Sequence, residues 1–343
     1  MAVEPQVLVT GAAGHLGCAL MLSLLPDHNL TPIGIDILPS ETTTHVGSIT
    51  DRAFITSIFT RYPSIRHVIH AATLHKPHVE SHSKTDFVEV NITGTLNLLE
   101  EASQLRNADG TPRIASFVFT STTSSFGKAV RAQPGDPAAW IDEAVVPVPK
   151  NIYGVTKIAA EDLCRLVQSQ TGMPTIVLRV SRFFPEEDDD EERRSAMGDE
   201  NLKVLELAYR RADVADIVSA CVCATQKAAD IGWGRYIISG PPPFPKDDIE
   251  VLRRLDRDAA SVFKLLVPGI EDVFATKGWS FLRRLDRVYD SSKAVEEIGW
   301  QPEYTIGKAI EKIARGEDWR SPLTYKVGKK GYHAVSTGVY TSR

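Results

Sequence analysis

Short apolar segments alternate with longer amphipathic segments from the start of the chain to Ser239. The apolar segments have the length of buried strands, and the segments between them carry apolar residues at helical spacing. The expected strands are Gln6–Thr10, Pro32–Ile37, His67–Ala71, Ser116–Thr120, Thr175–Val180 and Arg235–Ser239. The expected helices are Leu16–Leu25, Asp51–Arg61, Asp86–Leu105, Tyr153–Gln170 and Val214–Ala228. Because β-α-β connections are right-handed, this alternation predicts an α/β fold with a doubly wound parallel sheet.

Two proline-containing segments interrupt the alternation. Pro185–Asn201 holds the acidic run Glu186–Glu192, which we interpret as a solvated loop of mutually repelling charges. Pro241–Pro245 is a stiff connector that leads to Asp248–Trp319, where short helices are expected. The predicted organisation is a sheet domain (1–180 and 213–240), a small, mostly helical C-terminal substrate lobe (181–212 and 241–320) and a C-terminal tail (321–343).

The tail carries more apolar surface than a disordered terminus usually does. Its apolar and aromatic residues include Tyr325, Tyr332, Val335, Val339 and Tyr340. We therefore expect the tail to fold back over the sheet or over a partner subunit, with part of it near the opening of the substrate site.

Charge and composition argue against several classes of protein. A formal net charge of −5 lacks the basic surplus that binds a phosphate backbone or an anionic membrane. No apolar run approaches the roughly 18 residues of a membrane-spanning helix. The four cysteines, Cys18, Cys164, Cys221 and Cys223, fit buried free thiols in a reducing compartment and lack zinc-site spacing. We expect a cytoplasmic protein that binds no nucleic acid, no membrane and no metal.

A glycine-rich turn, Thr10–Gly17, follows the first expected strand and leads into an apolar helix. Glycines at three-residue spacing let the backbone approach a pyrophosphate, and the helix N-terminus offers N–H groups and a partial positive charge. Asp36 ends the next strand 19 residues beyond Gly17, where a carboxylate can accept hydrogen bonds from an adenosine ribose. Because Asp36 would repel a 2′-phosphate and Ile37–Pro39 supplies no arginine, the sequence predicts a Rossmann-type site for NAD rather than NADP.

Tyr153 and Lys157 begin an expected helix at four-residue spacing, which places both side chains on one helical face. An ordinary tyrosine has a pKa of about 10, and a nearby cation lowers it, so this tyrosine can serve as a general acid and base. The hydroxyl-rich segment Thr120–Ser125 ends another expected strand, at the sheet edge that borders the ligand crevice. One of its hydroxyls can hold a substrate oxygen near Tyr153, while most of the six hydroxyls are expected to cap local turns.

The order and spacing of these motifs resemble the extended short-chain dehydrogenase/reductases, specifically the NAD-dependent epimerase/dehydratase family, over about Val7–Val180. His70–Ala72, Asn91–Thr95 and, more weakly, Gly299–Pro302 add to the resemblance. It implies that Thr122, Tyr153 and Lys157 are catalytic. The residues that it implies for NAD binding are Gly11, Gly14, His15, Leu16, Gly17, Asp36, Ile37, Ser48, Ile49, Ala71, Ala72, Asn91, Tyr153 and Lys157.

Three departures from the family pattern concern the ligands. Ser48–Ile49 stands where the family often has an acidic residue against adenine. Arg182 replaces an asparagine that nucleotide-sugar members use near the substrate phosphates, which argues against UDP-sugar binding. Thr122–Ser124 lacks the Asp-Glu pair of the sugar dehydratases, which disfavours dehydration.

We therefore expect an NAD-dependent oxidoreductase that acts on a secondary alcohol or ketone of a hydroxyl-rich small molecule, and by family analogy we favour a sugar epimerase. The alternatives are an NAD-dependent dehydrogenase or reductase and a non-catalytic NAD-sensing protein. The apolar faces of Asp86–Leu105 and Tyr153–Gln170 further suggest a homodimer in which these helices pair with their copies.

Overall fold

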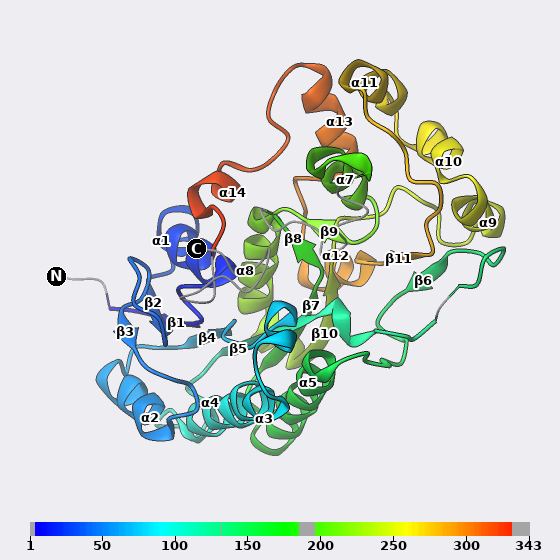
Figure 1. Cartoon of the computed structure of the whole chain (residues 1–343). Helices are drawn as coiled ribbons and strands as arrows, with labels where there is room; N and C mark the ends of the chain where they lie inside the picture. The colour runs from blue at the N-terminus through cyan, green and yellow to red at the C-terminus, as the bar shows by residue number, and fades with distance from the viewer. Residues whose placement is uncertain (1–3, 131, 185–195, 331–343) are drawn as a thin grey trace.

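A seven-stranded parallel sheet forms the centre of the protein, whose computed structural model describes residues 4–130, 132–184 and 196–330 (Figure 1). The strand order is β10-β7-β5-β4-β1-β2-β3. The strands are β1 (Val7–Thr10), β2 (Pro32–Asp36), β3 (His45–Val46), β4 (His67–His70), β5 (Ser116–Thr122), β7 (Thr175–Val180) and β10 (Trp233–Ile238). From β1 the successive strands are added first toward one edge of the sheet, as β2 and β3, and then toward the other edge, starting with β4. The switch point between β1 and β4 opens a crevice at the carboxyl ends of the strands.

The Rossmann-type doubly wound sheet predicted from the sequence is confirmed. Each of the six expected strands is present, with ends that shift by no more than two residues. The edge strand β3 was missed because its two residues are too few to show a pattern.

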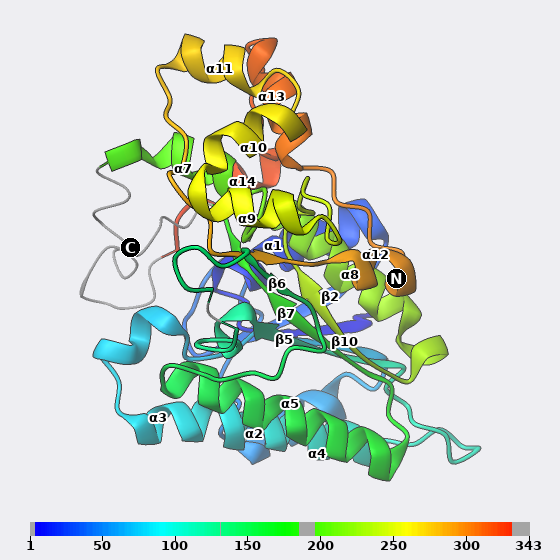
Figure 2. The same cartoon turned by 90° about the vertical axis from the view of Figure 1, so that its right-hand side faces the viewer.

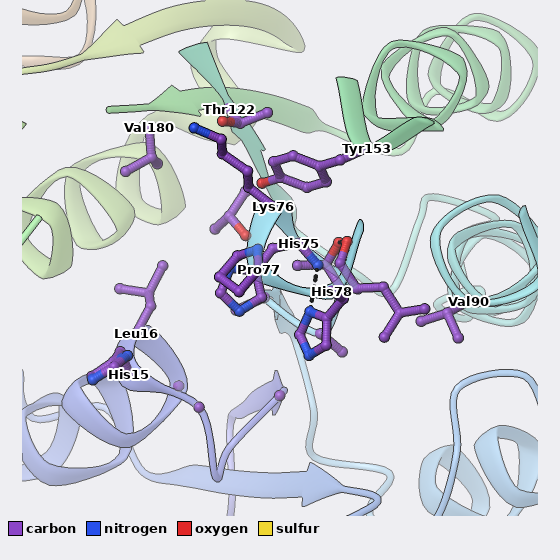
Figure 3. Close-up of a pocket in the computed structure, with 18 of the residues that line it drawn as sticks. His15, Leu16, His75, Lys76, Pro77, His78, Val90, Thr122, Tyr153 and Val180 are labelled. Atoms are coloured by element: carbon purple, nitrogen blue, oxygen red, sulfur yellow. Dashed lines mark hydrogen bonds between the residues drawn. The ribbon is translucent and has the colours of Figure 1, made fainter. Parts of the chain in front are cut away.

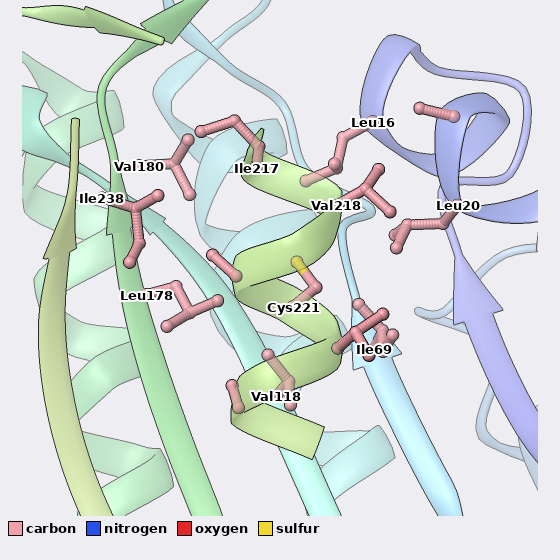
Figure 4. Close-up of a cluster of buried hydrophobic side chains, with 14 of the residues drawn as sticks. Leu16, Leu20, Ile69, Val118, Leu178, Val180, Ile217, Val218, Cys221 and Ile238 are labelled. Carbon is pink, nitrogen blue, oxygen red and sulfur yellow. The ribbon is translucent and has the colours of Figure 1, made fainter. Parts of the chain in front are cut away.

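Helices cover both faces of the sheet (Figure 2). One face is covered by α1 (His15–His28) and α8 (Val214–Ile231), and the other by α2 (Arg52–Arg61), α4 (Gly94–Gln104) and α5 (Ile152–Thr171). Ile217, Val218 and Cys221 of α8 face apolar side chains of the strands and of α1 (Figure 4). Burial of the apolar side chains on both faces of the sheet stabilises the packing of the helices against the strands.

Side chains fix the N-terminal ends of the two longest helices, α5 and α8. The Asn151 carboxamide accepts a hydrogen bond from the Gly154 N–H and starts α5, and the Asp213 carboxylate caps α8 through the Ala215 N–H. Gly172, in the left-handed conformation, ends α5. Such caps satisfy helix-end groups that have no partner within the helix.

The expected helix Asp86–Leu105 is divided into three parts. A short helix, α3 (Lys84–Val88), is followed by a π-helical turn, η2 (Glu89–Thr93), and then by α4. A π turn inserts one residue into the helical repeat, and such turns occur often at functional sites. Here the turn carries Asn91, which is 2% exposed.

A second apolar core lies beside the sheet and gathers the helices of the lobe, with Phe263 and Phe274 among its buried side chains. The helices that contribute are α7 (Asp199–Glu206), α9 (Ile249–Arg257), α10 (Ala259–Leu266), α11 (Ile270–Lys277) and α13 (Ile306–Ala314). Two small parallel sheets stand apart from the central one: β6 (Ala139–Ile141) with β11 (Arg287–Tyr289), and β8 (Arg182–Phe183) with β9 (Arg211–Ala212).

Two further helices of the C-terminal region, α12 (Ser292–Ile298) and α14 (Pro322–Val327), pack on the sheet domain, against α8 and β10 and against α1 and α8 respectively. The acidic run Glu186–Glu192, which was expected to form a solvated loop, lies outside the described residues, and so does the tail beyond Lys330. All four cysteines are free thiols, as expected, and Cys223 is the least buried of them. Among the described helices, none combines the length and apolar composition that crossing a bilayer requires.

A test of the turn between β1 and α1 is the replacement Gly17→Ala. A Cβ atom at Gly17 would lie 1.9 Å from the carbonyl oxygen of Gly11, which backbone atoms cannot accommodate without movement of the helix. We expect the melting temperature to fall by several degrees or more, since forced overpacking costs about 1–3 kcal/mol or more. The matched control is Gly307→Ala in α13, where a Cβ meets no atom within 4 Å and helix propensity favours alanine. Equal melting temperatures for Gly17→Ala and the wild type would refute this account of the turn.

Candidate active site

A cavity of about 910 Å³ lies at the carboxyl ends of the central strands. Its walls include residues that follow β1, β2, β4, β5 and β7. This is where the strand order places the ligand crevice of an open parallel sheet. Figure 3 shows its interior, with Thr122 and Tyr153 on one wall and His15 and Leu16 on the opposite one.

The glycine turn forms one end of the cavity, with Gly11, Gly14, His15, Leu16 and Gly17 in its wall. Gly11 adopts a φ of +75° and approaches the next crossover so closely that a Cβ there would lie 2.7 Å from the Ala72 nitrogen. Gly14, the N-cap residue of α1, provides no side-chain cap. The first turn of α1 therefore directs its unbonded backbone N–H groups and its partial positive charge at the cavity, where an anion can bind.

Asp36 lies beside this turn, at the end of β2. One of its carboxylate oxygens accepts from the Ala13 N–H at 3.0 Å and the other from the Leu38 N–H at 2.9 Å. Burial raises the pKa of this carboxyl, while the backbone hydrogen bonds from Leu38 and Ala13 oppose the rise. Each oxygen retains a further lone pair, so the carboxylate can also accept from the hydroxyls of a ribose.

Ile37, Ser48 and Ile49 line the cavity next to Asp36. Ile37 is 63% exposed and offers an apolar surface for a flat ring. The Asn97 carboxamide donates to the carbonyls of Ile49 and Thr50, both at 3.1 Å, and so fixes this wall from α4. Asn97 was not predicted from the sequence, where its only signal was its place as a polar residue on the buried face of an amphipathic helix.

Ala71 and Ala72 also line the cavity, whereas Asn91 does not. The Asn91 side chain lies behind the wall, where its amide donates to the Leu74 carbonyl and to Thr156 Oγ1. Its oxygen accepts from the Leu74 N–H and the Thr73 hydroxyl. Since all four hydrogen-bonding positions are used, Asn91 fixes the crossover after β4 against α5, and its predicted contact with a cofactor stays a prediction.

Thr122 and Tyr153 both reach the cavity, from the end of β5 and the first turn of α5. The Thr122 hydroxyl oxygen accepts from the Ser124 N–H at 3.0 Å, which fixes its position and leaves its hydrogen able to be donated. The hydroxyls of this segment serve both local and long-range contacts: Ser125 donates to the Thr122 carbonyl within the turn, whereas Ser121 donates to Glu161 of α5 and Thr120 to the His70 carbonyl of β4. A substrate oxygen between Thr122 and Tyr153 could therefore meet two hydroxyl groups at once.

Lys157 lies beneath the cavity wall and is 2% exposed. Its ammonium is 4.1 Å from the centre of the Phe119 ring. Burial lowers its pKa to about 7, although the Glu161 carboxylate raises it in part. Lys157 therefore changes charge near neutral pH, one helical turn below Tyr153.

Glu161 is the buried anion of this region. Its carboxylate binds the Arg179 guanidinium at 2.7 Å, accepts from the Ser121 hydroxyl at 2.5 Å and lies 3.2 Å from Arg235. These partners come from β5, β7 and β10, so one carboxylate ties α5 to three neighbouring strands. This network fixes the position of α5 relative to the sheet, and with it the positions of Tyr153 and Lys157.

The sequence analysis also missed the basic rim of the cavity. After β4, the 3-10 turn η1 (Lys76–Glu80) brings Lys76 and His78 to the cavity, next to His75 (Figure 3). Arg210, which precedes β9, lines it as well, together with Arg182. The rim's signal in the sequence was the close spacing of His75, Lys76 and His78, a few residues after the carboxyl end of β4. Within the described ranges, no cluster of histidine, cysteine and carboxylate side chains has the makings of a metal site.

The buried Lys157 predicts an unusual dependence of stability on pH. Its pKa is about 7 in the folded protein and ordinary, near 10.5, in the unfolded chain, so folding excludes a proton between these values. The burial penalty is therefore complete below pH 7 and disappears as the pH rises toward 10.5. We expect Lys157→Met to melt several degrees above the wild type at pH 6, with a difference that shrinks as the pH is raised toward 10.

The control is Lys150→Met, because Lys150 is an exposed lysine. The difference in melting temperature between Lys150→Met and the wild type should be the same at every pH. A wild-type protein more stable than Lys157→Met at pH 6 would contradict the assigned burial of the Lys157 charge.

Solved structures share this fold. UDP-glucuronic acid 4-epimerase from Bacillus cereus aligns with 94% of this chain and 100% of its own, with a TM-score of 0.61 and 18% identity. UDP-glucose 4-epimerase from Thermotoga maritima aligns with 91% and 99%, with a TM-score of 0.59 and 20% identity. At these identities the likeness establishes the architecture.

Sequence relatives cover different shares of the chain. UDP-glucose 4-epimerase of Halalkalibacterium halodurans is 29% identical over 180 residues, which are 50% of this chain and 49% of that relative. The match thus spans about half the length of that relative. The match with UDP-glucose 4-epimerase of Erwinia amylovora spans 52% of that relative's length. GDP-6-deoxy-D-mannose reductase of Pseudomonas aeruginosa is 25% identical over 332 residues, 92% of this chain and 97% of the relative.

The family model described as "NAD dependent epimerase/dehydratase family" matches residues 7–238, which is more than half of the chain. The match runs from β1 to β10 and includes the glycine turn, Asp36, Thr122, Tyr153 and Lys157. The chain therefore belongs to the NAD-dependent epimerase/dehydratase family of extended short-chain dehydrogenase/reductases.

Proposed function

We propose that the protein is an NAD-dependent oxidoreductase that acts on a secondary alcohol or ketone of a hydroxyl-rich substrate, and that its net reaction is the epimerisation of a sugar. One observation carries the proposal: Tyr153 and Thr122 open into the same cavity as the glycine turn and Asp36. A cofactor that extends along this cavity from Asp36 would have its far end near Tyr153.

The residues present fit a dinucleotide. At the glycine turn, the backbone approaches Ala72 too closely for any Cβ at Gly11, and the uncapped start of α1 suits a pyrophosphate. The Asp36 carboxylate suits the ribose, and the exposed Ile37 suits the adenine. Bound NAD supplies a hydride acceptor and donor at its nicotinamide ring.

In the proposed mechanism, Tyr153 takes the proton of the substrate hydroxyl during oxidation and returns a proton to the carbonyl oxygen during reduction. Thr122 donates its hydroxyl hydrogen to the same oxygen and holds it in place. Lys157, one turn along α5, favours the phenolate of Tyr153 when it carries its charge. The buried Glu161 network keeps these groups from shifting relative to the sheet.

The basic rim favours a substrate with an anionic group. Lys76 and Arg210 line both the main cavity and an adjoining cavity of about 570 Å³. Lys150, Arg283 and Arg287 also line the adjoining cavity, with Asp286 as its acidic member. We propose that the lobe which carries Arg283 covers this part of the substrate, and that the named relatives' sugar nucleotides are the class to try first, even though Arg182 in place of the family's asparagine argued against UDP-sugars from the sequence.

A reductase is the second candidate. The alignment with GDP-6-deoxy-D-mannose reductase extends over nearly the whole of both chains, whereas the alignments with the two UDP-glucose 4-epimerases cover about half. The two reactions differ in stoichiometry. An epimerase restores its cofactor in each cycle, whereas a reductase consumes one NADH for each product molecule.

A homodimer is a further proposal. Val88 of α3 and Val155 and Leu166 of α5 are apolar side chains that are 42%, 48% and 49% exposed. Helices α3 and α5 are in contact (Figure 2), so these side chains could form one face that a second copy covers. A pair of such helices from each of two copies would make a four-helix bundle.

The direct test of the proposed function is Tyr153→Phe. The variant should bind NAD with the affinity of the wild type and lose turnover by about 10²–10⁴-fold, the usual contribution of general acid–base catalysis. Turnover is measured by chromatography on a panel of sugar nucleotides, free sugars and sugar acids, with NADH absorbance recorded in the same samples. Tyr304→Phe is the matched control, since its ring packs against Lys312 and does not line the main cavity.

Wild-type turnover by Tyr153→Phe would overturn the assignment of Tyr153. A wild-type protein that binds NAD but converts no member of the panel would favour the NAD-sensing alternative. Product formation with unchanged NADH absorbance identifies an epimerase, and stoichiometric loss of NADH identifies a reductase.

A further inference from the structure

The C-terminal segment reaches back to the glycine turn. After α14 the chain continues to Lys330, whose backbone N–H donates to Nε2 of His15 at 2.7 Å. His15 is the first residue of α1, lines the cavity and is 5% exposed. Residues 315 positions apart in sequence are therefore joined at the start of the helix that faces the proposed pyrophosphate site.

A buried carboxylate anchors the start of this segment. Asp213, which is 0% exposed and caps α8, accepts from the Ser321 N–H at 2.9 Å and from the Thr324 hydroxyl at 3.1 Å. The Ser321 hydroxyl donates to the same carboxylate. Release of residues 321–324 would leave part of a buried charge without hydrogen bonds, which is strongly unfavourable. This end of the segment is therefore firmly held.

Apolar contacts anchor its middle. Helix α14 packs against α1 and α8, as Figure 1 shows, and Val327 is 3% exposed in the same core as Leu16. Complete burial of a valine side chain contributes about 1.5–3 kcal/mol. Gly328 then ends α14 with a φ of +61°, and the chain turns toward His15.

The contact with Lys330 determines how His15 is held. Because Nε2 accepts a hydrogen bond, a neutral His15 ring carries its proton on Nδ1. The contact also fixes the side chain of the first helical residue, at a helix start where Gly14 provides no side-chain cap. This contact restrains the His15 side chain without occupying the backbone N–H groups of the first turn, which stay directed at the cavity.

We propose that residues 321–330 form a C-terminal strap that positions His15, so that the affinity of the protein for NAD depends on the strap. The proposal rests on the proposed function only in that NAD is the ligand of the cavity. His15 is a positioning residue here: it holds the first turn of α1 in the geometry that binds the pyrophosphate.

Lys330→Pro tests the strap, because proline lacks the N–H that donates to His15 and leaves the anchors at Asp213 and Val327 intact. Loss of one such hydrogen bond predicts an NAD dissociation constant about 3–10 times that of the wild type by calorimetry. Lys330→Ala keeps the N–H and should bind NAD as the wild type does. A chain truncated after Lys329 removes the same donor without introducing proline, together with residues 331–343, so its NAD affinity is compared with that of a chain that ends at Lys330 and keeps the donor.

A double-mutant cycle with His15→Ala separates this role from general destabilisation. If the strap acts through His15, Lys330→Pro should have no further effect on NAD affinity in the His15→Ala background. Effects that multiply in the double variant, or wild-type affinity in both Lys330→Pro and the chain truncated after Lys329, would overturn the proposal. A wild-type protein that fails to bind NAD would instead refute the proposed function.

Discussion

The approach of Gly17 to the carbonyl of Gly11 is the contact on which the cofactor half of the site depends. Any Cβ at Gly17 would lie 1.9 Å from that carbonyl oxygen, so the helix can start directly above the end of β1 only if the residue is glycine. This placement puts the first turn of α1 against the cavity and brings the Ala13 N–H within 3.0 Å of the Asp36 carboxylate. The proposed cradle for a pyrophosphate and the proposed acceptor for a ribose therefore share one backbone geometry.

A buried charge organises the proposed catalytic half of the site in the same way. Glu161 binds Arg179 and Ser121 and so ties α5 to the strands that lead to the cavity. Tyr153 lies two helical turns before Glu161, and Thr122 directly follows Ser121. Both catalytic candidates are thus held by elements that this buried network joins, and both line the same cavity.

The sequence revealed those parts of the fold that have a local signature. The apolar runs predicted six strands, and the glycine spacing predicted the turn after β1. The two-residue β3 and the π turn around Asn91 were missed, because one is too short for periodicity and the other keeps a helical pattern of residues. The basic rim and the Glu161 network depend on residues that only the tertiary fold brings together. The tail was expected to fold back, and residues 321–330 do so, but a contact between Lys330 and His15 leaves no trace in sequence pattern.

The central claim is that the cavity binds NAD through the glycine turn and Asp36. Calorimetric titration of the purified wild-type protein with NAD and with NADP, in the same buffer, tests it most directly. We predict tighter binding of NAD by tenfold or more, since a 2′-phosphate would meet the Asp36 carboxylate, and a charge repulsion of about 1.4 kcal/mol already gives that ratio. Equal or tighter binding of NADP would contradict the claim.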